Sequence, residues 1–455
     1  MIDLIDALDD PALFQPWFAG PSWGPWRAVL KAACGHWLDD DEHTLFRQVA
    51  QRDPPSRRVR ELWIVAGRRA GKDSIASAIA AHAAGFVDYG HVLRPGELAS
   101  VLCLAVDKLQ AKIVLRYAKA FFERIPMLAE LVTRETADGL DISTNAELSV
   151  IASNFRAVRG RSIALAILDE CAYWRDETSA SPDVETYTAL LPGLVTVPDS
   201  MLIGMSSPYR KAGLLYTKWQ DHFGMPHDDV LVIQAASRVL NPTLPQRVID
   251  DAMARDPASA RAEWLAEWRD DIAAFVPREI VEAAVDWGIV ARPPIPNVEY
   301  VGFADAASGT GGDSFGAAIA HAEGERIVVD VAHELRPPFN PQTAIAEVAA
   351  IFSRYRINNV TGDRWAPGFV AEGFARAGLK YTYSERDRSD IYLEALPWLI
   401  SGNVRLLDNA RLVHQLASLE RRTTPSGRDR VDHPRGQANH DDISNAVAGV
   451  ARQSG

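Results

Sequence analysis

Between Glu61 and about Asp270, short continuous apolar runs alternate with stretches that have helical periodicity. Strands that are apolar on both faces are typical of parallel sheets covered by helices on each side. The pattern therefore predicts an α/β domain with a mostly parallel sheet. The expected strands are Leu62–Ala66, Ser100–Val106, Ser149–Ala152, Ile163–Leu168 and Met201–Met205, and the expected helices are Asp73–Ala84, Lys108–Ile125 and Ala258–Trp268.

A proline-rich break at Ala291–Pro296, after a short expected helix at Glu279–Val285, marks a linker or domain entry. Beyond it the alternation restarts. Three successive strands, a helix and a further strand are the order of an RNase H-like domain. These elements are expected at Tyr300–Ala304, Ala317–His321, Arg326–Val331, Pro341–Tyr355 and Asn359–Gly362.

The first 60 residues contain helix-like stretches with several tryptophans, Trp17, Trp23, Trp26 and Trp37. Amphipathic helices with a packed aromatic face are the favoured interpretation. The alternative is that these rings stack on a nucleotide.

The bulk properties are those of a globular protein of two or three domains, with 455 residues, 47% hydrophobic and 24% charged. No apolar run approaches the roughly 20 residues that span a bilayer, and the acidic start lacks the basic residues of a signal peptide. The three scattered cysteines fit a reducing compartment. We expect a cytoplasmic protein that binds no membrane. The net charge of −12 neither favours nor excludes DNA, because a basic groove can lie on an acidic body.

A phosphate-binding loop is predicted where the first strand meets its helix. The segment reads Gly67-Arg68-Arg69-Ala70-Gly71-Lys72-Asp73-Ser74. Strand, glycine-rich turn and helix start direct backbone N–H groups at an anion, and the lysine reaches the β- and γ-phosphates. Two positions depart from the usual motif: Ala66 replaces the first glycine, and Asp73 replaces the hydroxyl that ligates Mg²⁺. The alternative is a glycine turn with a solvated lysine.

Two carboxylates, Asp169 and Glu170, end the buried strand Ile163–Leu168. The carboxyl ends of strands are where open α/β sheets bind ligands. Asp169 is expected to hold Mg²⁺, and Glu170 to act as general base on the attacking water. Together with the loop, this pair predicts ATP hydrolysis.

Further polar residues are candidates for the same site. Arg68 could stabilise charge on the γ-phosphate as an arginine finger, or it could be a solvated or DNA-contacting charge. Arg159 and Arg161, before the acidic strand, are additional candidates. Ser206-Ser207-Pro208, after the strand Met201–Met205, could sense the γ-phosphate or form a simple turn.

Acidic residues in the C-terminal region predict a second, metal-dependent site. Asp305 and Asp363 end two expected strands, and Asp441 and Asp442 begin a helical run. Two-metal cleavage of phosphodiesters requires carboxylates that converge from different elements on cations about 3.5–4 Å apart. Taken singly, each is better explained as a surface acid or a helix cap. Asp313 and Asp330 are lesser candidates, a loop acid and a strand-end acid.

The basic stretch Arg421–Arg430, with His433 and Arg435 after it, could follow a DNA backbone. A solvated hairpin is the competing interpretation.

The order of these motifs resembles that of the large terminase subunit of tailed bacteriophages. The resemblance covers nearly the whole chain. It rests on the arginine-containing loop Gly67–Ser74, the stretch Arg159–Tyr173, the coupling motif Ser206–Pro208 and the downstream acids. It implies an ATPase that drives double-stranded DNA into a procapsid and a nuclease that cuts concatemeric DNA.

Residue by residue, the resemblance implies an ATPase centre of Lys72, Asp169 and Glu170 with Arg68 as the loop arginine. It implies a nuclease triad of Asp305, Asp363 and Asp441, with Asp442 as an additional candidate. The implied cofactors are ATP and Mg²⁺, with Mn²⁺ as an alternative in the nuclease site. The implied partners are double-stranded DNA, a portal protein and a small terminase subunit.

The resemblance also implies that the protein forms a homo-oligomeric ring on the procapsid and is compatible with a monomer in solution. It implies the cytoplasm of a bacterial host cell as the location of the protein. The expected domains are a helical segment on the adenine side of the ATPase (1–60), the ATPase core (61–272), a linker (273–298) and the nuclease (299–455). Two alternatives remain open. One is a repair helicase or translocase fused to a nuclease; the other is a non-enzymatic assembly protein with degenerate sites.

Overall fold

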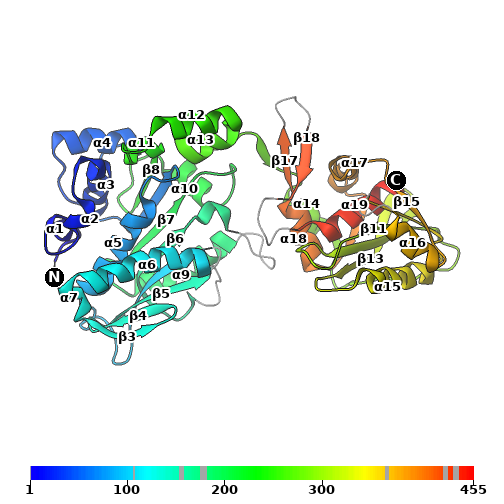
Figure 1. Ribbon diagram of the computed structural model, residues 1–455, viewed down its shortest axis with the longest axis horizontal. Coiled ribbons are helices and arrows are strands. Elements are labelled where there is room, and N and C mark those ends of the chain that lie inside the picture. The colour runs from blue at the N-terminus through cyan, green and yellow to red at the C-terminus, as the bar shows by residue number, and fades with distance from the viewer. Residues whose placement is uncertain are drawn as a thin grey trace. The chain divides into compact units, whose positions relative to one another are not determined.

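The computed structural model describes residues 2–105, 108–152, 158–174, 182–363, 368–423, 429–433 and 440–454. The chain divides into two compact units, the first ending at Asp270 and the second beginning at Asp271. Each unit is an α/β layer structure with its own sheet (Figure 1).

The first unit is built on an eight-stranded sheet of order β3-β4-β5-β2-β6-β7-β1-β8. The six strands from β5 to β8 in this order run parallel, as predicted, and the antiparallel β3 and β4 extend one edge. The strands are β1 (Glu61–Ala66), β2 (Ala99–Ala105), β3 (Val132–Thr136), β4 (Gly139–Ile142), β5 (Ala146–Ala152), β6 (Ser162–Asp169), β7 (Met201–Ser206) and β8 (Val230–Ala235).

Apolar side chains of the parallel strands enter two separate cores, one on each face of the sheet. In β1, Leu62 and Ile64 belong to one core, and Trp63 and Val65 belong to the other. The helices of this unit are α1 (Leu4–Asp9), α2 (Gln15–Phe18), η1 (Pro21–Trp23), α3 (Gly24–Cys34), α4 (Asp40–Ala50), α5 (Lys72–Gly85), α6 (Lys108–Arg124), α7 (Pro126–Ala129), η2 (Cys171–Tyr173), α9 (Pro182–Val195), α10 (Leu214–His222), α11 (Ser237–Leu240), α12 (Gln246–Arg255) and α13 (Pro257–Leu265).

The second unit contains a seven-stranded sheet of order β10-β16-β13-β12-β11-β14-β15. The antiparallel run β11-β12-β13 is followed by β14 and β15 parallel to β11, which is the RNase H-like order that the sequence predicted. These strands are β10 (Val285–Asp286), β11 (Tyr300–Asp305), β12 (Phe315–Glu323), β13 (Arg326–Leu335), β14 (Asn359–Gly362), β15 (Lys380–Tyr383) and β16 (Val404–Leu407).

Helices cover both faces of this second sheet. Phe303 packs in the core shared with α17, α18 and α19, and Ala304 packs in the core shared with α15 and α16. The helices are α14 (Arg278–Ala283), α15 (Pro341–Arg354), α16 (Phe369–Arg376), α17 (Arg388–Ile400), α18 (Ala410–Ser418) and α19 (Asp442–Ser454). A small separate sheet has the order β18-β17-β9, from β9 (Ile272–Ala274), β17 (Glu420–Thr423) and β18 (Asp429–Asp432).

The stretch 273–298, expected to be a linker, instead holds structure of the second unit. It contains most of β9 together with α14 and β10, and β10 pairs with β16. The physical reason is apolar content: Phe275, Val276, Val281 and Val285 are buried in the same core as Phe303.

The tryptophans of the first 60 residues divide between packing and exposure. Trp26 is fully buried, as the packing interpretation expects, whereas Trp37 is 80% exposed and Trp17 is 38% exposed. The packing interpretation is therefore right for Trp26 and wrong for Trp37.

Candidate nucleotide and metal sites

In the predicted phosphate-binding loop, the lysine side chain is buried against the backbone of the loop itself. Lys72 begins α5, is only 6% exposed, and its Nζ donates to the Ala66 carbonyl at 3.0 Å. Gly71 before it has φ +96°, a value that side chains rarely adopt, and a methyl group there would come within 3.1 Å of the Trp23 ring. The turn therefore requires glycine at this position.

Two side chains far away in the sequence hold the outer side of this loop. Trp26 Nε1 donates to the Ala70 carbonyl at 2.8 Å, and Asn241 Nδ2 donates to the Arg69 carbonyl at 2.8 Å. In a trans peptide the N–H points away from the preceding carbonyl. The N–H groups of Ala70 and Gly71 are thereby directed away from these two anchors, as an anion-binding nest requires.

The acidic strand and the serine motif meet the lysine at one edge of the sheet. Strands β6, β7 and β1 are parallel neighbours, so their carboxyl ends coincide. Glu170 Oε2 accepts from Ser206 Oγ at 2.7 Å and from the Ser207 N–H at 3.2 Å. Lys72 Nζ donates to Ser207 Oγ at 3.3 Å and lies 3.5 Å from Glu170 Oε1. Glu170 adopts φ +47°, a strained conformation of the kind found at functional sites.

Negative charge exceeds positive charge around this network. Asp169 is 4% exposed, and its Oδ1 has no hydrogen-bond partner among the described residues. Burial, and then repulsion from Glu170 and Asp73, raise the pKa of Asp169, although Lys72 opposes the shift. Burial likewise raises the pKa of Asp73. A buried carboxylate oxygen without a partner, among other acids, fits the oxygen ligands that Mg²⁺ prefers.

The structure separates Asp73 from Ser74. Asp73 interacts electrostatically with Lys72, Glu170 and Arg69, which places it with the acidic cluster. Ser74 lies instead in the wall of a pocket of about 400 Å³ formed by α2, η1, α5 and α6. Its aromatic lining consists of Trp17, Phe18, Trp23, Tyr117 and Phe121.

The candidate arginines differ in their exposure and in their ion-pair partners. Arg68 has a side chain that is 59% exposed and pairs with Glu263 Oε1 at 3.3 Å, so its role as an arginine finger stays a prediction. Arg161 pairs with Glu147 of β5. Arg159 is exposed, before β6.

In the second unit, Asp305 and Asp363 lie side by side. Asp305 ends β11 and Asp363 follows β14, and the register of these parallel neighbours pairs Ala304 with Gly362. Asn445 of α19 joins them, because its Nδ2 donates to Asp305 Oδ2 at 2.8 Å and to Asp363 Oδ2 at 3.0 Å. Burial raises the pKa of both carboxyls, and repulsion from Asp363 adds to the shift of Asp305. Two carboxylates this close and this poorly neutralised fit a divalent cation.

The adjacent Asp441 and Asp442 have opposite electrostatic surroundings. Asp441 Oδ1 accepts from Arg388 Nη1 at 2.9 Å and lies 3.0 Å from His433 Nδ1, while its Oδ2 accepts from the Tyr392 hydroxyl at 3.0 Å. Burial alone would raise the pKa of Asp441, but the hydrogen bond from His433 and the charge of Arg388 bring it below the ordinary value. The negative charge of Asp441 is thus neutralised by Arg388 and His433 in this structure.

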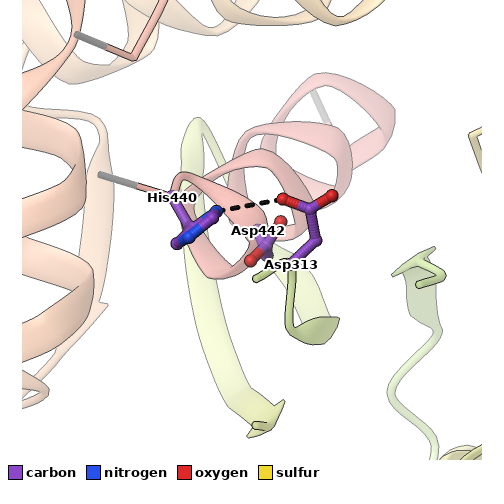
Figure 2. Close-up of side chains that lie close together, drawn as sticks. All are labelled: Asp313, His440 and Asp442. Carbon is purple, nitrogen blue, oxygen red and sulfur yellow. Dashed lines mark hydrogen bonds and ion pairs between the residues drawn. The ribbon is translucent and has the colours of Figure 1, made fainter. Parts of the chain in front are cut away.

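Asp442 is 6% exposed, and its Oδ2 accepts from the Ser314 N–H at 2.7 Å. Burial raises its pKa to about 6 despite that bond, with Asp441 and Asp313 adding repulsion. Figure 2 shows Asp442 beside Asp313 and His440, whose Oδ1 and Nδ1 are 2.9 Å apart. One ligand atom from each of these three lies within 4.8 Å of the others, and the same is true of Asp432, His433 and Asp441.

Two secondary expectations have clear outcomes. Asp330 was expected at a strand end but lies inside β13, fully buried, with Oδ2 2.6 Å from His321 Nδ1. Asp330 is not at a strand end because β13 continues to Leu335, and its carboxylate instead pairs with His321.

The described part of the basic stretch forms the antiparallel strands β17 and β18. Its described arginines pair with neighbouring acids: Arg421 with Asp429, Arg422 with Glu420, and Arg430 with Asp432. Residues 424–428 and Arg435 lie outside the described residues.

Asn445 and Asn241 contact the candidate sites but were not selected by the sequence analysis, and Trp26 was considered there only as a packing or stacking residue. Asn445 carried a usable signal, because it is four residues after Asp441 and three after Asp442 on one predicted helix. The sequence contains no sign that Trp26 or Asn241 bonds to the loop, since these bonds span 44 and 172 residues.

The first unit has the fold of a P-loop NTPase with a parallel-rich sheet, and the second has an RNase H-like fold. No family model and no curated protein matches the sequence. Among solved structures, the chain is similar to the large terminase of bacteriophage HK97, with 15% identity, a TM-score of 0.39 and coverage of 87% of this chain and 91% of that one. The large terminase of thermophilic bacteriophage D6E gives 11% identity, a TM-score of 0.40 and coverage of 87% and 94%.

The large terminase nuclease of thermophilic phage G20c, in a structure with bound magnesium, covers 40% of this chain and 99% of its own length. Its identity is 17% and its TM-score is 0.34. Among the described residues, no helix combines the length and apolarity needed to cross a bilayer.

Proposed function

We propose that this chain is the large subunit of a phage terminase, which uses ATP to drive double-stranded DNA into a procapsid and cuts that DNA with a metal-dependent nuclease. The observation that carries the proposal is the presence of two separate acidic sites on two suitable folds. One surrounds Lys72 and Glu170 in the first unit, and the other surrounds Asp305 and Asp363 in the second. The motif order described above supports the same function.

In the ATPase site, the contacts of Lys72 suggest how nucleotide binding alters the network. Lys72 now contacts Ser207 and Glu170, and phosphate oxygens of ATP would compete for its ammonium group. Its move to the β- and γ-phosphates would leave Glu170 oriented by Ser206 and the Ser207 N–H. Glu170 is then positioned to accept a proton from the attacking water.

Asp169 and Asp73 would hold Mg²⁺, which neutralises charge on the phosphates when bound. This assignment accounts for the Oδ1 of Asp169 that lacks a partner among the described residues. It also gives Asp73 the role usually held by a hydroxyl.

The pocket next to Ser74 would bind the adenine base. It adjoins the first turn of α5, so a nucleotide with its phosphates at Lys72 lies within reach of it. Trp17, Phe18 and Trp23 in its wall come from the first 60 residues, which supports the assignment of that segment to the adenine side. Aromatic faces stack on any nucleobase at about 1–3 kcal/mol per base.

In the nuclease site, Asp305, Asp363 and Asp442 would hold Mg²⁺ or Mn²⁺. The bound cations would activate water and stabilise the leaving oxygen. Asp441 would keep the start of α19 in place through Arg388 and His433, with metal binding as its alternative role. The proposal also covers partners, assembly and location, and these rest on the resemblance. The partners would be DNA, a portal protein and a small terminase subunit. The chain would assemble into a ring on the procapsid and act in the bacterial cytoplasm.

A non-enzymatic assembly protein is the second candidate, and Asp73 in the metal-ligand position is the observation that favours it. ATP turnover by the purified chain separates the two functions. Turnover that portal-bearing procapsids stimulate supports a terminase. Turnover that responds to DNA alone would favour a repair enzyme, and none under any condition would favour the degenerate protein.

A pair of variants tests whether the two sites act separately. Lys72→Ala should abolish ATP hydrolysis while cleavage of a plasmid with Mn²⁺ persists. Asp363→Ala should abolish cleavage while ATP hydrolysis persists. Loss of both activities from one folded variant would refute the two-site assignment.

A further inference from the structure

A single amide group bridges the two nuclease carboxylates. Asn445 is fully buried, and its Nδ2 contacts Asp305 Oδ2 at 2.8 Å and Asp363 Oδ2 at 3.0 Å. Its Oδ1 is buried without a partner among the described residues. The side chain therefore uses only its donor group, and it uses that group on two acids at once.

This arrangement lowers the stability of the fold. A buried polar atom that lacks a hydrogen bond costs about 1–3 kcal/mol, and an aliphatic side chain would avoid that cost. Buried unpaired groups of this kind call for a functional explanation. Here the explanation lies in the two carboxylates, which repel each other and would separate without a shared donor.

Glycines allow α19 to lie close to the sheet of the second unit. A methyl group on Gly316 of β12 would come within 2.3 Å of the Asp442 carbonyl oxygen, and one on Gly449 of α19 within 2.4 Å of the Phe303 ring. Both contacts show that α19 lies directly against the strands. Only at this separation can the short side chain of Asn445 reach the ends of β11 and β14 together.

We propose that Asn445 is a positioning residue that holds Asp305 and Asp363 at cation-binding separation before the cation arrives. The inference rests on the proposed nuclease site. Without a bridge, the free protein would hold the carboxylates apart, and binding of the cation would have to restore their geometry. With the bridge, the cation finds its ligands already placed, which is how partners of metal ligands raise metal affinity.

The test measures Mn²⁺ binding by the full chain without nucleotide, from the electron paramagnetic resonance signal of free Mn²⁺. All proteins carry Asp169→Asn, so that the ATPase site does not contribute. Asn445→Ala should weaken Mn²⁺ binding about ten- to hundredfold, as loss of such a partner typically does. Asp363→Asn is the positive control and should remove most of the binding.

Asn445→Asp provides a second measurement that a purely structural role would not reproduce. A further acid beside Asp305 and Asp363 should lower the melting temperature of the metal-free protein, and saturating Mn²⁺ should reverse the loss. A structural residue would lower the melting temperature equally with and without Mn²⁺, and that result would overturn the inference.

Two binding outcomes are also distinguishable. If Asn445→Ala binds Mn²⁺ within twofold of its parent while Asp363→Asn does not bind, the role of Asn445 is refuted and the nuclease site stands. If the parent itself binds no Mn²⁺, the nuclease site is refuted and this inference with it.

Discussion

The ionisation of Asp442 gives the sharpest quantitative test of the proposed nuclease site. Its pKa rises from the ordinary 3.8 to about 6 because the carboxyl is buried. A shift of this size corresponds to about 3 kcal/mol between the two protonation states. The folded state therefore binds the proton more tightly than the unfolded state. The resulting stabilisation is present below about pH 4 and is lost as the pH rises through about 6.

Asp442→Asn should remove this penalty without removing the contact to the Ser314 N–H, because the amide oxygen can accept the same bond. At pH 8, in chelator, the variant should be more stable than the parent by up to about 3 kcal/mol. Most of that gain should disappear between pH 6 and pH 4. The stability of the second unit can be measured separately from that of the first by urea titration. At each urea concentration, pulsed hydrogen exchange is measured on the peptide that contains α19.

Asp441→Asn is the matched control, one residue away on the same helix. Its carboxylate is stabilised by His433 and Arg388, so the substitution should destabilise the metal-free protein at pH 8. Opposite signs for the two neighbours would support the electrostatic assignment. A destabilised Asp442→Asn protein at pH 8, or a gain that does not change with pH, would refute it.

Three further substitutions probe the ATPase site. Asp73→Ala removes a proposed Mg²⁺ ligand and should weaken Mg²⁺-dependent ATP binding about tenfold in calorimetry; unchanged or tighter binding would exclude Asp73 as a metal ligand. Trp23→Ala opens the aromatic pocket and should raise the KM for ATP about tenfold, with binding of inorganic triphosphate as the unaffected control. Ser206→Ala removes the 2.7 Å bond to Glu170 and should lower kcat about 10- to 100-fold at saturating ATP; an unchanged kcat would exclude Ser206 from orienting Glu170.

Strand ends were the part of both sites that the sequence could predict. Parallel strands bring their carboxyl ends to one edge, where open α/β sheets bind ligands, so acids that end β6 and β11 or follow β14 were expected there. The pattern selected Asp169, Asp305 and Asp363 as candidates without any knowledge of packing. The structure brings Asp305 and Asp363 to one Asn445 side chain, and their roles in a metal site stay a prediction. By contrast, β3 was not predictable from apolar runs, because the middle residues of Val132–Thr136 are exposed.

Asp441 was the predicted third acid at the start of α19 and Asp442 an addition, and the sequence could not show how the surroundings of the two differ. Adjacent helical residues point about 100° apart, so either Asp441 or Asp442 could face the metal ligands. Their surroundings are set by Arg388 and Ser314, which lie 53 and 128 residues away in the sequence. The same dependence on distant packing concealed the role of Asn445.

The placement of β10 has a consequence for how the second unit can be isolated. β10 covers one edge of the seven-stranded sheet by pairing with β16. A fragment that begins at residue 299 would lack this strand and would uncover the backbone N–H and C=O groups of β16. It would also lose Phe275, Val281 and Val285 from the core. Exposed strand edges beside exposed apolar surface recruit other chains, so such a fragment should self-associate, whereas one that begins at Asp271 keeps its edge covered.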